Sequence, residues 1–161
     1  MHKPSFWRGY LAGIGLMLAL GFGTIYYFFL RIPDISLTQI GLEELDGRPY
    51  DPAPLVGQRV VLNYWATWCG PCIEEFPIFE QAQRQAGAGT TFLVVSDELA
   101  ATIQRFLRKH PLGFRMLRVH RPLPGVNSRP VTYGFGRRGQ LSTTHMGTIT
   151  APDLHTFVAG L

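Results

Sequence analysis

Cysteine is scarce in this sequence, with two among 161 residues, Cys69 and Cys72. A structural zinc site needs four ligands, and the chain has no second cysteine pair to supply them. The five histidines do not replace that pair, because no two of them are spaced three to five residues apart. The composition therefore favours a redox pair over its two alternatives, half of a zinc site and a pair of inert thiols.

Runs of basic residues are also missing. The formal net charge is +4, but Lys3, Arg8 and Arg31 all precede the first acidic residue, Asp34. Without these three residues, the rest of the chain is close to neutral. A nucleic-acid-binding protein would be expected to carry a basic stripe interleaved with aromatic side chains. We therefore expect no nucleic-acid partner.

Charge is absent from residues 11–30, which are rich in Leu, Ile, Phe and Gly. About twenty apolar residues are enough to cross a bilayer as a helix. A cleaved signal peptide and a buried helix are the alternatives, but a signal peptide would end in small residues, whereas this run ends at Leu30 and Arg31. Because Lys3 and Arg8 favour a cytoplasmic tail, we expect a tail at 1–10 and a single transmembrane anchor at 11–30.

The rest of the chain divides into a linker with an N-terminal extension, residues 31–58, and a domain, residues 59–161. The first part contains several prolines, and we expect one short strand at 35–38 in it. Nothing in it indicates chemistry, so Glu43 and Glu44 are predicted to be solvated. His120, in the later domain, has no partner evident in the sequence and is predicted to lie in a loop.

The domain alternates between strand and helix patterns. Its first strand contains Val60-Val61-Leu62, an apolar run typical of a strand that is covered on both faces. Strand, helix and strand in succession predict a parallel central pair. Strands are expected at 59–65, 91–95, 114–119 (an edge strand), 129–133 and 141–146. Helices are expected at 69–86, from a cap at Ser96 or Asp97 to Lys109, and from a cap near Thr150 to the C-terminus.

Both cysteines lie in Trp68-Cys69-Gly70-Pro71-Cys72, where the first strand meets a helix. Two thiols at this spacing share a helix face and can close a disulfide without moving the backbone. The thiolate is the nucleophile, and a helix N-terminus stabilises negative charge, so Cys69 is predicted to attack and Cys72 to resolve. Pro71 fits the first helical turn, and Gly70 leaves room for a partner chain.

A carboxyl group is predicted one turn beyond the thiol pair. Cys72, Glu75, Phe76 and Phe79 follow the spacing of one helix face, which places Glu75 on the inward side. Burial raises the pKa of a carboxyl group and suits it to exchange a proton with the thiols. The alternative is an ordinary surface glutamate at the edge of the apolar face.

Residues 61–77 resemble the active-site segment of the membrane-anchored, thioredoxin-like thiol-disulfide oxidoreductases of the TlpA, ResA and CcmG group. The resemblance implies an α/β thioredoxin-like fold, a central mixed sheet flanked by helices, with a β-hairpin added at 31–58. It implies an acid at Glu75 that serves the cysteines, and a cis-proline at Pro130 that faces them. Arg129 departs from the small or hydroxylated residue usual before that proline, and would place positive charge beside the thiolate.

The resemblance also implies an activity and a location. We expect thiol-disulfide exchange at a redox-active Cys69-Cys72 disulfide, with no other cofactor. The expected partners are protein disulfide substrates, for example in cytochrome c maturation, and a membrane electron donor. The domain would face the periplasm or cell exterior from the cytoplasmic membrane. Copper delivery is the alternative. Thioredoxin-like copper carriers, however, have three residues between their cysteines and a downstream histidine ligand, whereas this chain has two residues there. A non-catalytic interaction module is the third possible function.

Overall fold

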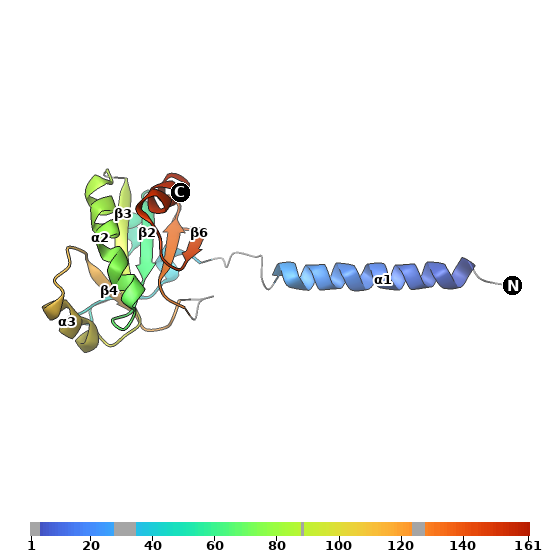
Figure 1. Cartoon of the computed structure of the whole chain (residues 1–161), viewed down its shortest axis with the longest axis horizontal. Helices are drawn as coiled ribbons and strands as arrows, with labels where there is room; N and C mark the ends of the chain where they lie inside the picture. Colours follow the sequence, from blue (N-terminus) through green and yellow to red (C-terminus); the bar gives the residue numbers. More distant parts are fainter. Residues whose placement is uncertain (1–3, 28–34, 88, 124–127) are drawn as a thin grey trace. The chain divides into compact units, whose positions relative to one another are not determined.

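The structure, a computed structural model, describes residues 4–27, 35–87, 89–123 and 128–161. The chain divides into two units, Met1–Ile32 and Pro33–Leu161. The first unit contains helix α1, Pro4–Ile25 (Figure 1). Its segment Trp7–Ile25 is long and apolar enough to cross a membrane, judged by length and composition. The helix begins earlier than the predicted boundary at residue 11, while residues 28–30, Lys3 and Arg31 lie outside the described residues.

The second unit is built on a six-stranded sheet in the order β1-β4-β3-β2-β5-β6. Strand β3 pairs in parallel with β2 and with β4, and the other pairs are antiparallel, so the sheet is mixed, as the resemblance implied. The strands are β1 (Leu42–Glu44), β2 (Arg59–Tyr64), β3 (Thr90–Ser96), β4 (Met116–Val119), β5 (Val131–Phe135) and β6 (Leu141–Met146).

Strand β2 shows why both faces of the sheet are covered. Val60, Leu62 and Tyr64 belong to one hydrophobic cluster, while Val61 belongs to a second one. Side chains alternate across a strand, so the two clusters lie on opposite faces. The N-terminal segment supplies apolar side chains to the first cluster. Three helices supply the second (Figure 1): α2 (Gly70–Gln85), α3 (Ala100–Lys109) and α4 (Ala151–Ala159).

The helix starts were predicted with mixed success. Thr150 is the N-cap of α4, and its side chain accepts a hydrogen bond from the backbone N–H of Asp153, which confirms the predicted cap. The cap of α3 was predicted wrongly, because its N-cap is Leu99, which makes no side-chain capping bond. Ser96 instead ends strand β3, and Asp97 forms an ion pair elsewhere in the fold.

The N-terminal extension also differs from the prediction. Residues 35–38 do not form a strand: Ser36 makes one isolated bridge to Gln140, and Leu37–Gln39 is a 3₁₀ helix. The strand of this region is β1, which pairs with β4. Strand β4 is therefore not an edge strand, as had been predicted, because β1 lies outside it in the sheet.

Glu43 was predicted to be solvated, and this is wrong. It is 8% exposed, and its carboxylate accepts a hydrogen bond of 2.7 Å from Nη1 of Arg118. The bond to Arg118 lowers the pKa of Glu43. The imidazole of His120 forms an ion-pair contact with the same carboxylate, so His120 has a partner as well. These contacts fix β1 against β4.

Candidate active site

Cys69 and Cys72 form a disulfide at the start of α2, with their Cα atoms 5.3 Å apart. Cys69 is the N-cap residue and has an extended backbone, whereas Cys72 lies in the first turn of the helix. The helix therefore starts one residue later than predicted, and the thiols lie where the sequence placed them. Cys69 retains 4% of its surface and Cys72 retains none. A partner chain approaching this end of α2 therefore reaches Cys69 first.

The helix start stabilises negative charge on the sulfur of Cys69. The backbone N–H of Cys72 donates a hydrogen bond to Sγ of Cys69 over 3.2 Å. The sixteen-residue helix α2 has no acidic residue in its first turn, so the positive end of its dipole is not offset there. When the disulfide is reduced, these features favour a thiolate at position 69.

Trp68, Gly70 and Pro71, which flank the cysteines in sequence, are exposed. Trp68, immediately before Cys69, is 69% exposed. A Cβ atom added at Gly70 would meet nothing within 4 Å, and Pro71 is exposed in the first turn of α2. The predicted space for a partner chain is therefore present at Gly70.

Glu98, which is not among the predicted site residues, holds the loop between β2 and α2. One of its carboxylate oxygens accepts a 2.6 Å hydrogen bond from the backbone N–H of Thr67, and the other accepts a 2.8 Å bond from the Thr67 hydroxyl. The strands β2 and β3 are parallel, so the residues that follow them meet at one edge of the sheet. An acid placed just after β3 was the signal that could have identified Glu98.

Glu75 is buried, with 3% of its surface exposed, as its helical position predicted. One carboxylate oxygen accepts a hydrogen bond from the backbone N–H of Ile149. The other lies 3.5 Å from the side-chain amide nitrogen of Asn63, which donates to it. Burial raises the pKa of Glu75, and these two hydrogen bonds oppose the rise only in part. A carboxyl group in this environment can hold a proton at a higher pH than a surface glutamate.

The peptide between Arg129 and Pro130 is cis, as the resemblance implied. Pro130 is buried and directly precedes β5. The first residue of β5, Val131, pairs with Tyr64 at the end of β2. Pro130 is thus positioned at the end of the strand that leads into the thiol loop.

Arg129 has partners that the sequence did not reveal. Its Nη2 atom donates to a carboxylate oxygen of Asp97 at 2.6 Å and to the Tyr64 hydroxyl at 2.7 Å. The guanidinium group lies 4.3 Å from the centre of the Tyr64 ring and 5.7 Å from that of Trp68. The side chains of Arg129 and Asp97 are only 10% and 22% exposed. The positive charge expected beside the thiolate is thus paired with a carboxylate, which weakens its field at Cys69.

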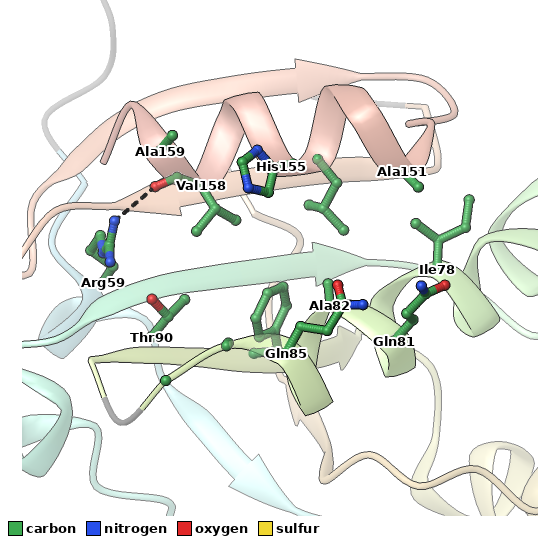
Figure 2. A pocket seen from close by; sticks show the side chains of 14 residues that line it. Arg59, Ile78, Gln81, Ala82, Gln85, Thr90, Ala151, His155, Val158 and Ala159 are labelled. Atoms are coloured by element: carbon green, nitrogen blue, oxygen red, sulfur yellow. Dashed lines mark hydrogen bonds between the residues drawn. The ribbon is translucent and has the colours of Figure 1, made fainter.

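A groove of about 300 Å³ lies between α2 and α4 (Figure 2). It is lined by the second half of α2, including Ile78 and Ala82, and by α4 residues such as His155 and Val158. At one end, Arg59 donates a hydrogen bond to the carbonyl of Val158. The thiol pair lies at the opposite end of α2, so this groove does not belong to the disulfide site.

The histidine and methionine that the sequence places together at 145–146 do not form a shared site. A ring nitrogen of His145 lies 2.9 Å from the carbonyl oxygen of Thr148, while Met146 is 69% exposed. In the part of the chain that the structure describes, no three His, Cys, Asp or Glu side chains are grouped so as to hold a metal ion.

Comparison with known proteins identifies the family. The family model described as Redoxin matches residues 31–120. The thiol-disulfide oxidoreductase ResA of Halalkalibacterium halodurans is 28% identical, and the match covers 97% of this chain and 94% of that protein. The thioredoxin-like protein YneN of Bacillus subtilis is 26% identical, with coverage of 91% and 95%.

A solved structure extends the comparison to the fold. A thiol:disulfide interchange protein described as DsbE, from Chlorobium tepidum, superimposes with a TM-score of 0.64 and is 26% identical. The match covers 80% of this chain and 93% of that one. The buried cysteine pair at the mouth of α2 thus lies in a thioredoxin-like fold, and the chain belongs to the Redoxin family as a thiol-disulfide oxidoreductase of the ResA and CcmG type.

Proposed function

We propose that this oxidoreductase is a membrane-anchored reductase of protein disulfides that works outside the cytoplasm, with cytochrome c maturation as one setting that needs such a reductant. The observation that carries the exchange chemistry is the hydrogen bond from the Cys72 N–H to Sγ of Cys69 at the start of α2, whereas the reducing direction rests on the Gly70-Pro71 pair between the cysteines. The hydrogen bond supports Cys69 as the attacking sulfur. The apolar helix α1 supports the anchor.

The exchange proceeds in two steps that balance in electrons. The Cys69 thiolate attacks one sulfur of a substrate disulfide, forms a mixed disulfide and releases the other substrate sulfur as a thiolate. Cys72 then attacks Sγ of Cys69 and releases the second substrate thiolate. The substrate gains two electrons, and the Cys69–Cys72 pair loses two. A membrane electron donor returns two electrons to the pair before the next cycle.

Glu75 is proposed to exchange the proton that this cycle requires. Cys72 must lose a proton before it attacks, and Glu75 lies one turn further along the same face of α2. The neighbouring side chain on β2, Asn63, has no carboxyl group that could take this role. Its amide donates a hydrogen bond to Glu75. The exposed Trp68 and Gly70-Pro71 pair are proposed to form the surface on which the substrate chain rests, and the buried Pro130 is proposed to border it.

We propose the following domain organisation. Residues 1–10 form a cytoplasmic tail and 11–30 the anchor, while 31–58 connect the anchor to the thioredoxin-like domain at 59–161. Residues 31–58 include β1, which completes one edge of the sheet. The domain therefore needs part of this segment to fold.

We expect Glu75→Gln to remove one inflection from the pH profile of disulfide exchange. Burial raises the pKa of Glu75, so this inflection lies above the ordinary glutamate value of about 4.3. A carboxyl group whose pKa is higher in the folded state stabilises the fold below its unfolded pKa, and this contribution is lost as the pH rises through the folded pKa. As the pH rises from the unfolded pKa to the folded pKa, the unfolding free energy of the wild type should therefore fall relative to that of Glu75→Gln.

Exchange rates and denaturant unfolding, measured between pH 4 and pH 8, check this expectation. The exposed neighbour Glu74 gives the matched control, because Glu74→Gln removes a carboxyl group from the same helix without touching the buried site. An exchange profile in Glu75→Gln that coincides with the wild type would remove Glu75 from the mechanism.

We expect the protein to stay in the membrane with its C-terminus outside the cytoplasm. A reporter active only in the periplasm, fused after Leu161, should be active, and the chain should resist extraction by alkaline carbonate. The reason is that the apolar segment Trp7–Ile25 of α1 is long enough to form a single span. Soluble protein of reduced mass would show that the N-terminus is a cleaved signal. An inactive reporter would show that the C-terminus lies in the cytoplasm.

A further inference from the structure

One peptide group connects Glu75 to a histidine that the mechanism above does not use. The N–H of Ile149 donates to the Glu75 carboxylate. The carbonyl oxygen of the same peptide unit belongs to Thr148, and a ring nitrogen, Nε2, of His145 lies 2.9 Å from it. A carbonyl accepts, so Nε2 must carry the hydrogen in this contact. The hydrogen-bond chain thus runs from the imidazole through one peptide to the buried carboxylate.

A row of polar residues also lies between the same two residues on one face of the sheet. His145 on β6 is directly opposite Thr132 on β5, and Thr132 is opposite Asn63 on β2. Directly opposite residues share a face of a sheet, and Asn63 donates to Glu75. The side-chain oxygens of Asn63 and Thr132 are buried, and the described residues offer them no hydrogen-bond partner. The link from Glu75 to the half-buried His145 therefore runs through the Thr148–Ile149 peptide, and the polar row lies between the two residues without joining them by hydrogen bonds.

His145 is the charged partner best placed to act on Glu75. Its positive charge, when present, lowers the pKa of Glu75, whereas burial raises it. On α2, the titratable groups next to Glu75 are Glu74, which is exposed, and the cysteines, which do not titrate while they form a disulfide. Strand β2 presents the neutral Asn63. Helix α4 carries Asp153 in its first turn, and its carboxylate accepts a hydrogen bond from the Thr150 hydroxyl.

We propose that His145 is a positioning residue that sets the charge state of Glu75 through the Thr148–Ile149 peptide. A protonated imidazole donates more strongly to the Thr148 carbonyl, polarises the peptide and strengthens the Ile149 bond to the carboxylate. Histidine is the side chain whose charge changes between pH 5 and pH 8. Without a positive charge at position 145, Glu75 holds its proton more tightly. The coupling between His145 and Glu75 does not depend on the proposed function. Only its effect on disulfide exchange rests on that function.

Two substitutions that fix the charge at position 145 test the coupling. His145→Lys keeps a donor and a permanent positive charge, whereas His145→Gln keeps a donor without charge. The carbon-13 carboxyl signal of Glu75 is followed by NMR in the full-length, oxidised protein in detergent micelles, and is assigned by its loss in Glu75→Gln. The titration midpoint of Glu75 should lie higher in His145→Gln than in His145→Lys, by about half a pH unit for one charge at this partly exposed position.

The matched control is His155, an exposed histidine on α4. His155→Lys and His155→Gln should give the same Glu75 midpoint as each other. Equal midpoints in the two His145 variants would overturn the coupling, whatever their exchange rates. If the two midpoints differ while Glu75→Gln exchanges disulfides with the wild-type pH profile, the coupling stands and the catalytic role of Glu75 fails.

Discussion

Replacing Cys69 with serine is expected to reduce disulfide exchange to the uncatalysed background. Replacing Cys72 with serine is expected instead to trap substrates as stable mixed disulfides on Cys69. The two outcomes differ because Cys69 is the helix N-cap that retains exposed surface, whereas Cys72 is fully buried in the first turn. The chain has no third cysteine that could replace either of them. Reduction of a small disulfide, followed by mass spectrometry of the trapped species, measures both effects.

The same difference should be visible in the reduced wild-type protein. Alkylation at mildly acidic pH is expected to modify Cys69 well before Cys72, because the helix start and the Cys72 N–H favour a thiolate at position 69. Exposed Met146 provides a control, since Met146→Ser should change neither exchange nor trapping. Equal alkylation of the two cysteines, or trapping by the Cys69→Ser variant, would reverse the assignment of attacking and resolving sulfur.

The parts of the site that were predictable are local in sequence. The three-and-four spacing of α2 was enough to place Glu75 on its inward face, and the structure confirms the burial. The continuous apolar run Val60-Val61-Leu62 in β2 was enough to predict a strand covered on both faces. In each case the evidence lay within one helix or strand, where the backbone period alone decides which side chains share a face. The cis peptide before Pro130 was predicted from the resemblance to the family, because no periodicity within one helix or strand indicates it.

The parts that could not be predicted depend on contacts between distant segments. Glu43 looks like a surface acid in its own segment and becomes buried only because β1 pairs with β4, which brings Arg118 beside it. His145 and Glu75 likewise meet through a peptide in the turn between β6 and α4. Strand register decides the first pair and the packing of α2 against the turn decides the second, and one sequence contains neither for segments that lie far apart.

Arg129 is the case with the largest consequence for function. From the sequence alone, a cation before Pro130 was expected to lie beside the thiolate, where it would favour the thiolate and make the pair more oxidising. The structure pairs that cation with Asp97 and the Tyr64 hydroxyl. Two opposite charges in contact produce a weaker field at a third site than one charge alone. The reductase assignment rests on the Gly70-Pro71 pair. Because the charge of Arg129 is paired, it argues against that assignment less strongly than the sequence implied.

The wild-type protein is expected to have a reduction potential near that of reducing thioredoxins, about −270 mV, and well below the −120 mV or so of strong oxidants. Gly70-Pro71 is the dipeptide found in reducing thioredoxins, and no histidine lies between the cysteines. Equilibration of the full-length protein with glutathione buffers measures the value. A potential above about −150 mV would end the reductase assignment.

Substitutions at the Arg129–Asp97 pair should move that potential in opposite directions. Asp97→Asn leaves the guanidinium charge uncompensated beside Trp68, so it stabilises the Cys69 thiolate and makes the reduced pair more stable. The potential should rise by about 30 mV, which corresponds to about 1.4 kcal/mol for a two-electron couple. Arg129→Gln leaves the Asp97 carboxylate alone and should lower the potential. The double variant removes both charges and should return close to the wild type, because the field at the sulfur comes from the imbalance of the pair. If all three variants have the wild-type potential, the pair serves the fold alone, and the potential is set by the helix start and the Gly70-Pro71 dipeptide.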